Sequence, residues 1–331
     1  MGLVFRETLK NRVNYTFGTN FLHCGNFHLE FIVKKWPIPR NFITERFMDQ
    51  RARPYRSVLY IPGSKERALE KAKTLPVDAI IFDLEDAVSV DEKENARGIL
   101  KDALAAGGYG SRMRIVRING LDTQWGEADA KAAAAMDCDA VLLPKVESAA
   151  QVDALAALVG DKPIWAMMET PRGMLNAAEI AAHPQLTGFV MGTNDLAKEL
   201  QCRFRADRLP MLTSLSLCLL AAKAEGIVIV DGVYNAFKDT EGLKTECDQG
   251  RDMGMDGKTL IHPAQVDVAN AAFAPTDAEI DLARRQIQAF EETEAKGEGV
   301  AVVDGKIVEN LHVVTAKEIL AKADAIAALE G

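Results

Sequence analysis

Short apolar runs that alternate with helix-like stretches constrain the fold of this 331-residue chain more than any other feature. Between Arg56 and about Phe273, eight such runs are each followed by a helical pattern or a helical turn. This alternation is typical of βα units that share a parallel sheet. The expected strands are Ser57–Ile61, Ala79–Phe82, Arg114–Ile118, Ala140–Leu143, Ile164–Met168, Gly188–Met191, Ile227–Val230 and Thr259–Ile261.

Eight βα units over about 210 residues match the size of a (β/α)8 barrel. We therefore predict an α/β protein with a (β/α)8 TIM barrel over residues 51–275, and a doubly wound sheet is the alternative. Barrels of this kind take their catalytic groups from the carboxyl ends of the strands and from the loops that follow. The polar residues at these expected ends include Asp83, Glu85, Asp86, Arg117, Asn119, Lys145, Glu147, Glu169, Thr193, Asn194, Asp195, Asp231 and His262.

The first fifty residues differ from the predicted barrel. They hold nine of the 21 aromatic residues and seven Lys and Arg against four Asp and Glu, and they show no clear helix or strand period. We interpret residues 1–50 as an atypical N-terminal segment. A misassigned start, with Met48 as the true first residue, is the favoured explanation, and a targeting peptide is the other.

A different pattern follows the predicted barrel. It predicts a charged helix from Pro275 to about Glu294, a hairpin around Asp304-Gly305, and an Ala-rich helix from Thr315. Residues 276–331 are therefore expected to form a C-terminal helical and hairpin module.

The composition excludes several classes of protein. The net charge of −9 argues against non-specific nucleic-acid binding, because a phosphate-binding surface usually shows a basic excess. The chain has no run of about 18 apolar residues and no signal-peptide pattern, so we expect no membrane insertion. Its five cysteines are scattered and form no zinc-site spacing. These features predict a cytoplasmic protein in a reducing compartment.

Two carboxylates at consecutive strand ends suggest a metal site. Glu169 and Asp195 would lie close together at the mouth of a barrel, and Mg2+ binds through one or two protein carboxylates while it keeps several waters. We predict Mg2+ as the cofactor, with Mn2+ as an acceptable substitute. The alternative is that Glu169 only forms a salt bridge with Arg172 or Arg117.

Arg117 ends an apolar strand, and its planar fork suits bidentate binding of a substrate carboxylate or thioester oxygen. The alternative is a structural ion pair with Asp83 or Glu85. Asp83, Glu85 and Asp86 themselves are expected to support water molecules around a cation rather than bind it directly.

Ser64, Lys65 and Arg67 follow the first expected strand and open a helix, so this turn could hold a phosphate group. The alternative is that Lys65 and Arg67 form a solvated helix face. The turn is not a Walker loop, and the chain contains no GxGxxG, which disfavours an NTPase or a dinucleotide enzyme.

Several motifs together resemble the HpcH/HpaI aldolase and citrate lyase β-subunit superfamily, in its branch of stand-alone CoA-ester enzymes. The resemblance runs from about Arg56 to Thr315. Its motifs are Arg56-Ser-Val-Leu-Tyr-Ile-Pro-Gly63, Ile81-Phe-Asp-Leu-Glu-Asp-Ala-Val88, Arg117-Ile-Asn119, Leu143-Pro-Lys-Val-Glu-Ser148, Met168-Glu-Thr-Pro-Arg-Gly173, Gly192-Thr-Asn-Asp-Leu196 and Gly257-Lys-Thr-Leu-Ile-His-Pro263.

The resemblance implies a TIM barrel that assembles as a homotrimer or homohexamer and binds a CoA thioester. It implies Mg2+ held by Glu169 and Asp195, and a substrate and its developing enolate held by Arg117. It also implies contacts with CoA from Arg56, Ser64, Lys65 and Arg67, and support of metal-bound waters by Asp83, Glu85 and Asp86.

The C-terminal module of this family implies an acid/base residue that reaches the site of a neighbouring subunit. Family members carry an aspartate in a Gly-Lys-Met-Ile-Asp-like segment, where this chain reads Gly305-Lys-Ile-Val-Glu309. Glu309 is one methylene longer, and a misplacement of about 1 Å can cost roughly 100-fold in rate. The Val-Glu-Asn-Leu-His stretch resembles the branch that includes (3S)-malyl-CoA thioesterases.

Three functions remain open at this point. The favoured one is Mg2+-dependent hydrolysis of a (3S)-malyl-CoA-type thioester to malate and CoA, with Glu309 or Asp83 activating water. The second is reversible cleavage of malyl-, methylmalyl- or citramalyl-CoA to acetyl- or propionyl-CoA plus glyoxylate or pyruvate. The third is a subunit of a citrate-lyase-type complex that needs an acyl carrier protein, against which the C-terminal module argues.

Overall fold

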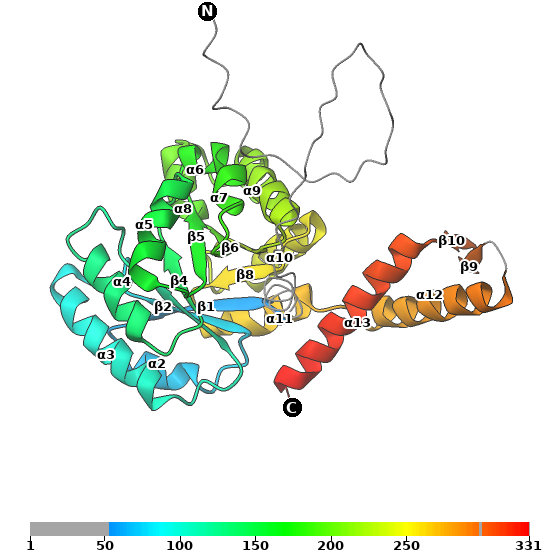
Figure 1. The fold of residues 1–331 in the computed structure, drawn as a ribbon, viewed down its shortest axis with the longest axis horizontal. Helices are drawn as coiled ribbons and strands as arrows, with labels where there is room; N and C mark the ends of the chain where they lie inside the picture. The colour runs from blue at the N-terminus through cyan, green and yellow to red at the C-terminus, as the bar shows by residue number, and fades with distance from the viewer. Residues whose placement is uncertain (1–52, 298–299, 331) are drawn as a thin grey trace, which may run out of the picture. The chain divides into compact units, whose positions relative to one another are not determined.

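A closed parallel barrel forms the centre of the protein in the computed structural model, which describes residues 53–297 and 300–330. The predicted N-terminal segment, with Met48, lies outside these residues. Eight strands follow one another around the barrel in chain order (Figure 1). They are β1 (Ser57–Pro62), β2 (Ala79–Asp83), β3 (Met113–Arg117), β4 (Ala140–Leu143), β5 (Ile164–Met168), β6 (Leu186–Met191), β7 (Val228–Asp231) and β8 (Gly257–Leu260).

The closure of the sheet confirms the predicted (β/α)8 barrel and excludes the doubly wound sheet. Ser57 of β1 pairs with Lys258 of β8, so the first and last strands leave no free edge. All eight expected strands are present, and their ends shift by no more than two residues because pairing with neighbours decides where each strand stops.

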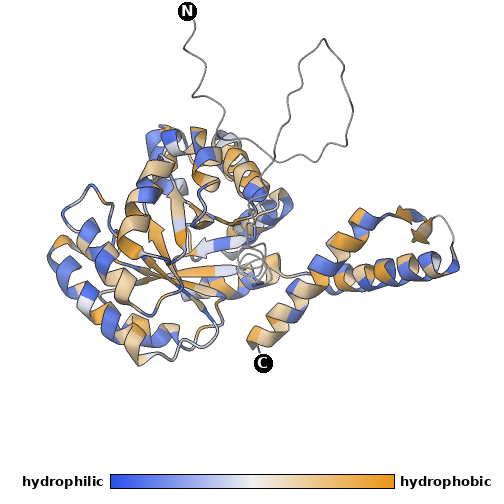
Figure 2. Cartoon of the chain, in the orientation of Figure 1, coloured by the Kyte–Doolittle hydropathy of each residue, from blue (hydrophilic) through white to orange (hydrophobic). Residues whose placement is uncertain are grey.

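Helices cover the outside of the barrel. They are α2 (Glu66–Ala72), α3 (Lys93–Ala106), α4 (Gly126–Ala135), α5 (Ala149–Val159), α6 (Pro171–Leu175), α7 (Ala177–Ala181), α8 (Thr193–Glu199), α9 (Leu212–Glu225), α10 (Thr240–Met253) and α11 (Val266–Phe273), with short 3-10 turns η1 (Val90–Glu92), η2 (Leu209–Met211) and η3 (Pro263–Gln265). Figure 2 shows largely hydrophobic strands inside helices that carry both hydrophilic and hydrophobic residues. This arrangement separates a core between strands and helices from a second core inside the barrel.

The interior of the barrel is filled by side chains. Trp165 of β5 lies fully buried against Tyr55, with ring centroids 5.6 Å apart. The strand beside it must leave room for this ring, because a Cβ on Gly188 of β6 would lie 2.4 Å from Trp165 Cε2. The barrel is therefore a packed core, and a ligand can enter only from its ends.

The C-terminal module consists of α12 (Asp277–Lys296), an antiparallel hairpin of β9 (Ala301–Val303) and β10 (Lys306–Val308), and α13 (Asn310–Glu330). The predicted Asp304-Gly305 turn is present, and both residues have positive φ. The last helix begins at Asn310, five residues before the predicted Thr315. Val313 packs with Ala301 and Val308 there, so tertiary burial overrides the low helix propensity of its β-branched side chain.

No helix in the part of the chain that the structure describes is long and apolar enough to cross a membrane.

Candidate active site at the mouth of the barrel

A cavity of about 330 Å³ opens at the carboxyl ends of the strands. It brings together residues from β1, β2, β3, β5 and β6 that are far apart in the sequence. This is the end of the barrel where the strand-end argument places catalytic groups. The polar residues that line it include Tyr60, Asp83, Asp86, Arg117, Glu169 and Asp195.

Arg117 is a mostly buried residue in the lining of this cavity, and it lies within a group of carboxylates. Its Nε and Nη2 atoms donate to the two carboxylate oxygens of Asp83 at 2.7 and 2.5 Å, and Nη1 lies 2.8 Å from Glu85 Oε2. Burial alone would lower the pKa of the guanidinium, but the Asp83 and Glu85 carboxylates raise this pKa well above its usual value. The ion pairs with Asp83 and Glu85, named as the alternative for Arg117, are thus present. They keep the Arg117 guanidinium protonated at the mouth of the barrel.

Asp83 is fully engaged at this position. Besides Arg117, its carboxylate accepts hydrogen bonds from the backbone N–H groups of Glu85 at 2.8 Å and Ala87 at 3.0 Å. A carboxylate has about four acceptor directions. Asp83 therefore orients Arg117, and its geometry does not fit the predicted role of activating water.

Glu169 and Asp195 meet around Lys145, which follows β4. The Lys145 backbone N–H donates to Glu169 Oε1 at 2.8 Å, and Lys145 Nζ lies 3.0 Å from Glu85 Oε1 and 3.7 Å from Asp195 Oδ2. A Cβ on Gly192 would lie 2.4 Å from Glu169 Oε2, so only glycine leaves space for this carboxylate. Lys145 was noted among the polar residues at the expected strand ends, but no role at the site was predicted for it.

Negative charge is in excess at the mouth. Burial, with repulsion from Glu85, raises the pKa of Glu169 to about 7. A divalent cation between Glu169 and Asp195 would offset this repulsion, and carboxylate oxygens are the ligands that Mg2+ prefers. The charged groups that produce the excess are Asp83, Glu85, Asp86, Glu169 and Asp195 against Arg117 and Lys145.

The two carboxylates also fit the way Mg2+ is usually held. Within the described residues there is no group of three or more His, Cys, Asp or Glu side chains that could hold a metal ion. Mg2+ dehydrates reluctantly and is usually bound by one or two carboxylates, with water and substrate oxygens as its other ligands. The donor set of Glu169 and Asp195 therefore suits Mg2+ better than a metal that needs a complete protein cage.

The predicted phosphate-binding turn lies at the same end of the barrel but outside the cavity. Ser64 is half-buried, Lys65 and Arg67 are exposed, and Lys65 Nζ lies 3.1 Å from Glu92 Oε2. Both partners of this pair are close to half exposed, so it contributes little to stability. A ligand that extends out of the mouth could therefore take Lys65 from Glu92 at a small energetic cost.

Arg56 lies at the opposite end of the barrel. It precedes β1, where its Nε and Nη2 donate to the Asp78 carboxylate at 3.0 and 2.9 Å and its backbone N–H donates at 2.7 Å. Both side chains are almost completely buried. The predicted contact of Arg56 with CoA does not fit this position, because a residue before a parallel strand lies at the amino end and not at the mouth.

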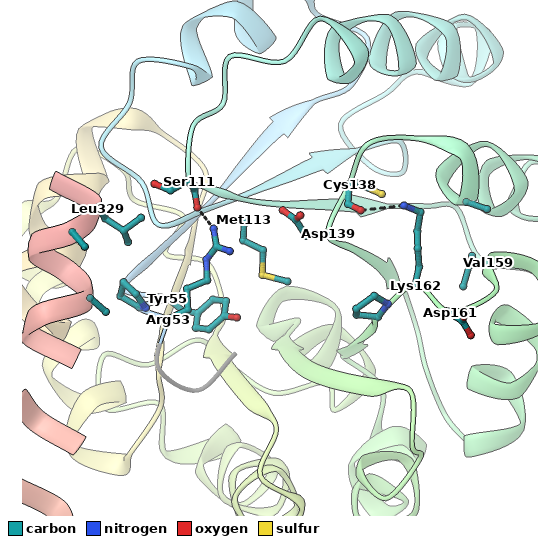
Figure 3. Close-up of a pocket in the computed structure, with 15 residues that line it drawn as sticks. Arg53, Tyr55, Ser111, Met113, Cys138, Asp139, Val159, Asp161, Lys162 and Leu329 are labelled. Carbon is teal, nitrogen blue, oxygen red and sulfur yellow. Dashed lines mark hydrogen bonds between the residues drawn. The ribbon is translucent and has the colours of Figure 1, made fainter. Parts of the chain in front are cut away.

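A larger cavity, of about 870 Å³, lies at this amino end (Figure 3). Its two basic side chains bind backbone carbonyls: Lys162 Nζ donates to the carbonyls of Met136 and Cys138 at 2.9 and 3.1 Å, and Arg53 donates to the carbonyl of Ser111. It contains no cluster of carboxylates like that at the mouth. The amino end of a TIM barrel usually serves stability, so the smaller cavity is the candidate active site.

Glu309 lies in the C-terminal module, where it is exposed and lines a separate cavity of about 250 Å³ with Phe290 and Ile307. Its backbone N–H donates to His312 Nδ1 at 2.9 Å. Within its own chain, Glu309 does not line the mouth cavity.

Comparison with known proteins adds to this geometry. Residues 56–263 match the model of the HpcH/HpaI aldolase/citrate lyase family, and residues 207–327 match a model described as C-C bond lyase of the TIM-barrel fold. A (3S)-malyl-CoA thioesterase from Cereibacter sphaeroides is 69% identical over 281 residues, which cover 85% of this chain and 99% of that protein.

More distant relatives share the fold. Citrate lyase subunit beta from Leuconostoc mesenteroides is 36% identical over 82% of this chain and 93% of its own length. The crystal structure of protein CitE from Mycobacterium tuberculosis in complex with magnesium, acetoacetate and coenzyme A is 31% identical, with a TM-score of 0.68, and it covers 83% of this chain and 99% of that chain.

Proposed function

The chain belongs to the HpcH/HpaI aldolase/citrate lyase family, and from this premise we propose that it is a Mg2+-dependent enzyme that hydrolyses (3S)-malyl-CoA to malate and CoA. The observation that carries the proposal is the 69% identity to a (3S)-malyl-CoA thioesterase over 99% of that protein's length. The match extends over almost the whole relative, so it spans the segments that form the mouth of the barrel as well as the scaffold.

In this reaction the oxygen of a water molecule bonds to the thioester carbonyl carbon and the C–S bond breaks. The products are the free thiol of CoA, a new carboxylate on malate, and one proton. Negative charge develops on the carbonyl oxygen as the water adds, and positive groups placed beforehand lower the barrier to this step. Arg117 is such a group, because Asp83 fixes the orientation of its guanidinium.

Glu169 and Asp195 would hold Mg2+, with Mn2+ as a substitute, and the CitE structure with magnesium supports this assignment. When bound, the metal ion supplies positive charge to a substrate oxygen. Lys145 holds Glu169 in place through its backbone N–H. Glu85 and Asp86 lie beside Arg117 and would orient waters around the site.

Because the oxygens of Asp83 are engaged, we assign the activation of water to Glu309 contributed by a neighbouring copy. This assignment requires a homo-oligomer, which we propose to be a trimer or hexamer in the cytoplasm. The unpaired Cys138, Cys202, Cys218 and Cys247 suit a reducing compartment. Ser64, Lys65 and Arg67 would contact the phosphate groups of CoA outside the cavity.

A second candidate is reversible cleavage of the malyl C–C bond to acetyl-CoA and glyoxylate. The lyase models and the citrate lyase relatives favour it, and positive charge at Arg117 would stabilise an enolate as well as a tetrahedral intermediate. A citrate-lyase-type subunit that needs an acyl carrier protein is the third. The C-terminal module does not separate these classes, because the citrate lyase relative matches more of the chain than residues 51–275 alone supply. The lower identity of the citrate lyase relative, 36% against 69% for the thioesterase, disfavours a function as a citrate-lyase-type subunit.

The test is a product assay on the purified chain with (3S)-malyl-CoA and Mg2+, in which free thiol and glyoxylate are followed in parallel. Thiol release with malate and without glyoxylate is the expected result. Glyoxylate with acetyl-CoA and without thiol would replace hydrolysis by the lyase reaction. Turnover that begins only when an acyl carrier protein partner is added would identify a subunit of a complex.

A further inference from the structure

The hydroxyl of Tyr60 lies at the floor of the mouth cavity without a strong hydrogen-bond partner among the described residues. Tyr60 is a residue of β1 that contacts the core inside the barrel and lines the cavity above it. Its hydroxyl donates to Met167 Sδ of β5 at 3.7 Å. A thioether is a weak acceptor, so this hydroxyl can turn to a better acceptor without breaking a strong bond.

The ring of Tyr60 is held in place by Arg117. The guanidinium carbon lies 5.0 Å from the ring centroid, within the range of a cation–π contact. Burial raises the pKa of the Tyr60 hydroxyl, and the carboxylates of Asp83 and Glu169 raise it further against the opposing charge of Arg117. The hydroxyl therefore keeps its proton and remains a neutral donor.

The size of the cavity decides which part of a CoA thioester can reach this hydroxyl. Its volume of about 330 Å³ lies at the small end of ligand pockets, which span roughly 300–1,000 Å³. It suits the acyl group, and the bulk of CoA must extend outwards. The floor then meets the far end of the acyl group, which in a malyl thioester is a carboxylate.

We propose that Tyr60 is a specificity residue whose hydroxyl donates a hydrogen bond to the carboxylate at the far end of the acyl group. The ring of the same residue braces Arg117. This inference rests on the proposed function and deepens it, because it names the side chain that distinguishes an acyl group ending in a carboxylate from one ending in a methyl group. A hydroxyl suits this task at a mouth crowded with carboxylates, since it adds a donor and no charge.

The test compares Tyr60→Phe with the wild type on two ligands that differ at the far end of the acyl group. The ligands are (3S)-malyl-CoA, assayed as kcat/KM from its consumption, and 3-hydroxybutyryl-CoA, assayed as an inhibition constant. A hydrogen bond to a charged group is worth about 1.5–3 kcal/mol, so we expect kcat/KM for (3S)-malyl-CoA to fall about ten- to a hundredfold. The inhibition constant of 3-hydroxybutyryl-CoA should not change.

Tyr109→Phe is the matched control. Tyr109 is also buried, its ring packs edge-on against Phe82 with centroids 5.1 Å apart, and it does not line the mouth. We expect this variant to keep both wild-type values. Tyr60→Leu removes the ring as well, and it should lower kcat beyond the effect of Tyr60→Phe because Arg117 loses its brace.

Two outcomes would overturn the proposal. Unchanged kcat/KM in Tyr60→Phe would mean that the hydroxyl does not contact the substrate. Equal weakening of both ligands would mean that it supports the site in general and does not distinguish the carboxylate. A wild-type protein that leaves (3S)-malyl-CoA intact would instead contradict the proposed function, and it would do so before any variant is made.

Discussion

The two ends of the barrel each bury an arginine, yet only one end has the charges of an active site. At the amino end, Arg56 forms an ion pair with the carboxylate of Asp78, and both side chains are almost completely buried. At the mouth, Arg117 meets Asp83 and Glu85, and further carboxylates remain beyond them. The first arrangement is a buried ion pair, whereas the second has excess negative charge next to an open cavity.

This difference identifies the functional end better than volume does. The cavity at the amino end is more than twice as large as that at the mouth. Lys162, the lysine that lines the cavity at the amino end, donates to backbone carbonyls, and these hydrogen bonds stabilise the fold. Uncompensated negative charge at partly buried carboxylates destabilises the folded protein. We therefore interpret the excess of carboxylates at the mouth as part of a site that a positively charged ligand completes.

The strongest test of this comparison removes one charge at the mouth. Glu169→Gln or Asp195→Asn should lower kcat by about a thousandfold or more, equivalent to about 4 kcal/mol of transition-state stabilisation. Glu169→Gln should keep or raise the melting temperature, because a buried carboxylate repelled by Glu85 becomes neutral. Thiol release and thermal melting measure the two effects. Glu147→Gln, at an exposed strand-end glutamate, is the control that should behave as wild type. Full activity in both mouth variants would contradict the metal assignment.

The second test makes the complementary change at the amino end. Arg56→Met leaves Asp78 buried without its ion-pair partner, and a broken buried pair costs about 3–5 kcal/mol of folding free energy. We expect that loss in urea unfolding, while the KM for the CoA thioester on folded protein stays at its wild-type value. The double variant Arg56→Met/Asp78→Leu should recover much of the stability, because both charges are then gone. A large rise in KM with unchanged stability would instead support the predicted contact between Arg56 and CoA.

Much of the fold could be predicted because the βα pattern repeats eight times along the chain. An error of one or two residues at the end of a single strand therefore does not change the predicted fold. The same logic predicted that Glu169, Asp195 and Arg117 lie at one end of the barrel, since parallel strands bring their carboxyl ends to one face, and all three line the mouth cavity. The predicted CoA contact of Arg56 came from resemblance alone, and the place of Arg56 before β1 already pointed to the other end of the barrel. Tyr60 was not predicted as a residue of the cavity, because an aromatic residue within a strand is usually a core residue. The role proposed for Glu309 requires a second copy of the chain, and the order of residues within one chain does not specify where another copy binds.

The pH dependence of stability offers a third, smaller test. Glu169 has a pKa of about 7 in the folded protein against 4.5 ordinarily, so the folded state binds its proton more tightly than the unfolded state. Stability should therefore fall as pH rises from about 4.5 to about 7, by about 2–3 kcal/mol. Urea unfolding in EDTA across this range measures the slope, and Glu169→Gln should flatten it. Added Mg2+ should also reduce the slope, because a bound cation favours the charged carboxylate. An equal slope in Glu169→Gln would assign the effect to another group.

The smallest effect is expected outside the cavity, where the mouth meets solvent. Lys65 pairs with Glu92 through side chains that are 56% and 44% exposed, so the pair is weak and can yield to a phosphate. Lys65→Ala and Arg67→Ala should each raise KM for the CoA thioester by about three- to tenfold, with kcat unchanged, since one exposed charge contributes about 1 kcal/mol. Added salt should raise the KM of the wild type more than that of the variants, because salt screens exposed charges. Lys71→Ala, in the last turn of the same helix, is the control and should leave KM as it is. If both variants keep the wild-type KM, the CoA portion of the substrate extends from the mouth along another side of the barrel. The contrast in charge between the two ends would then explain binding of the acyl group but not binding of CoA.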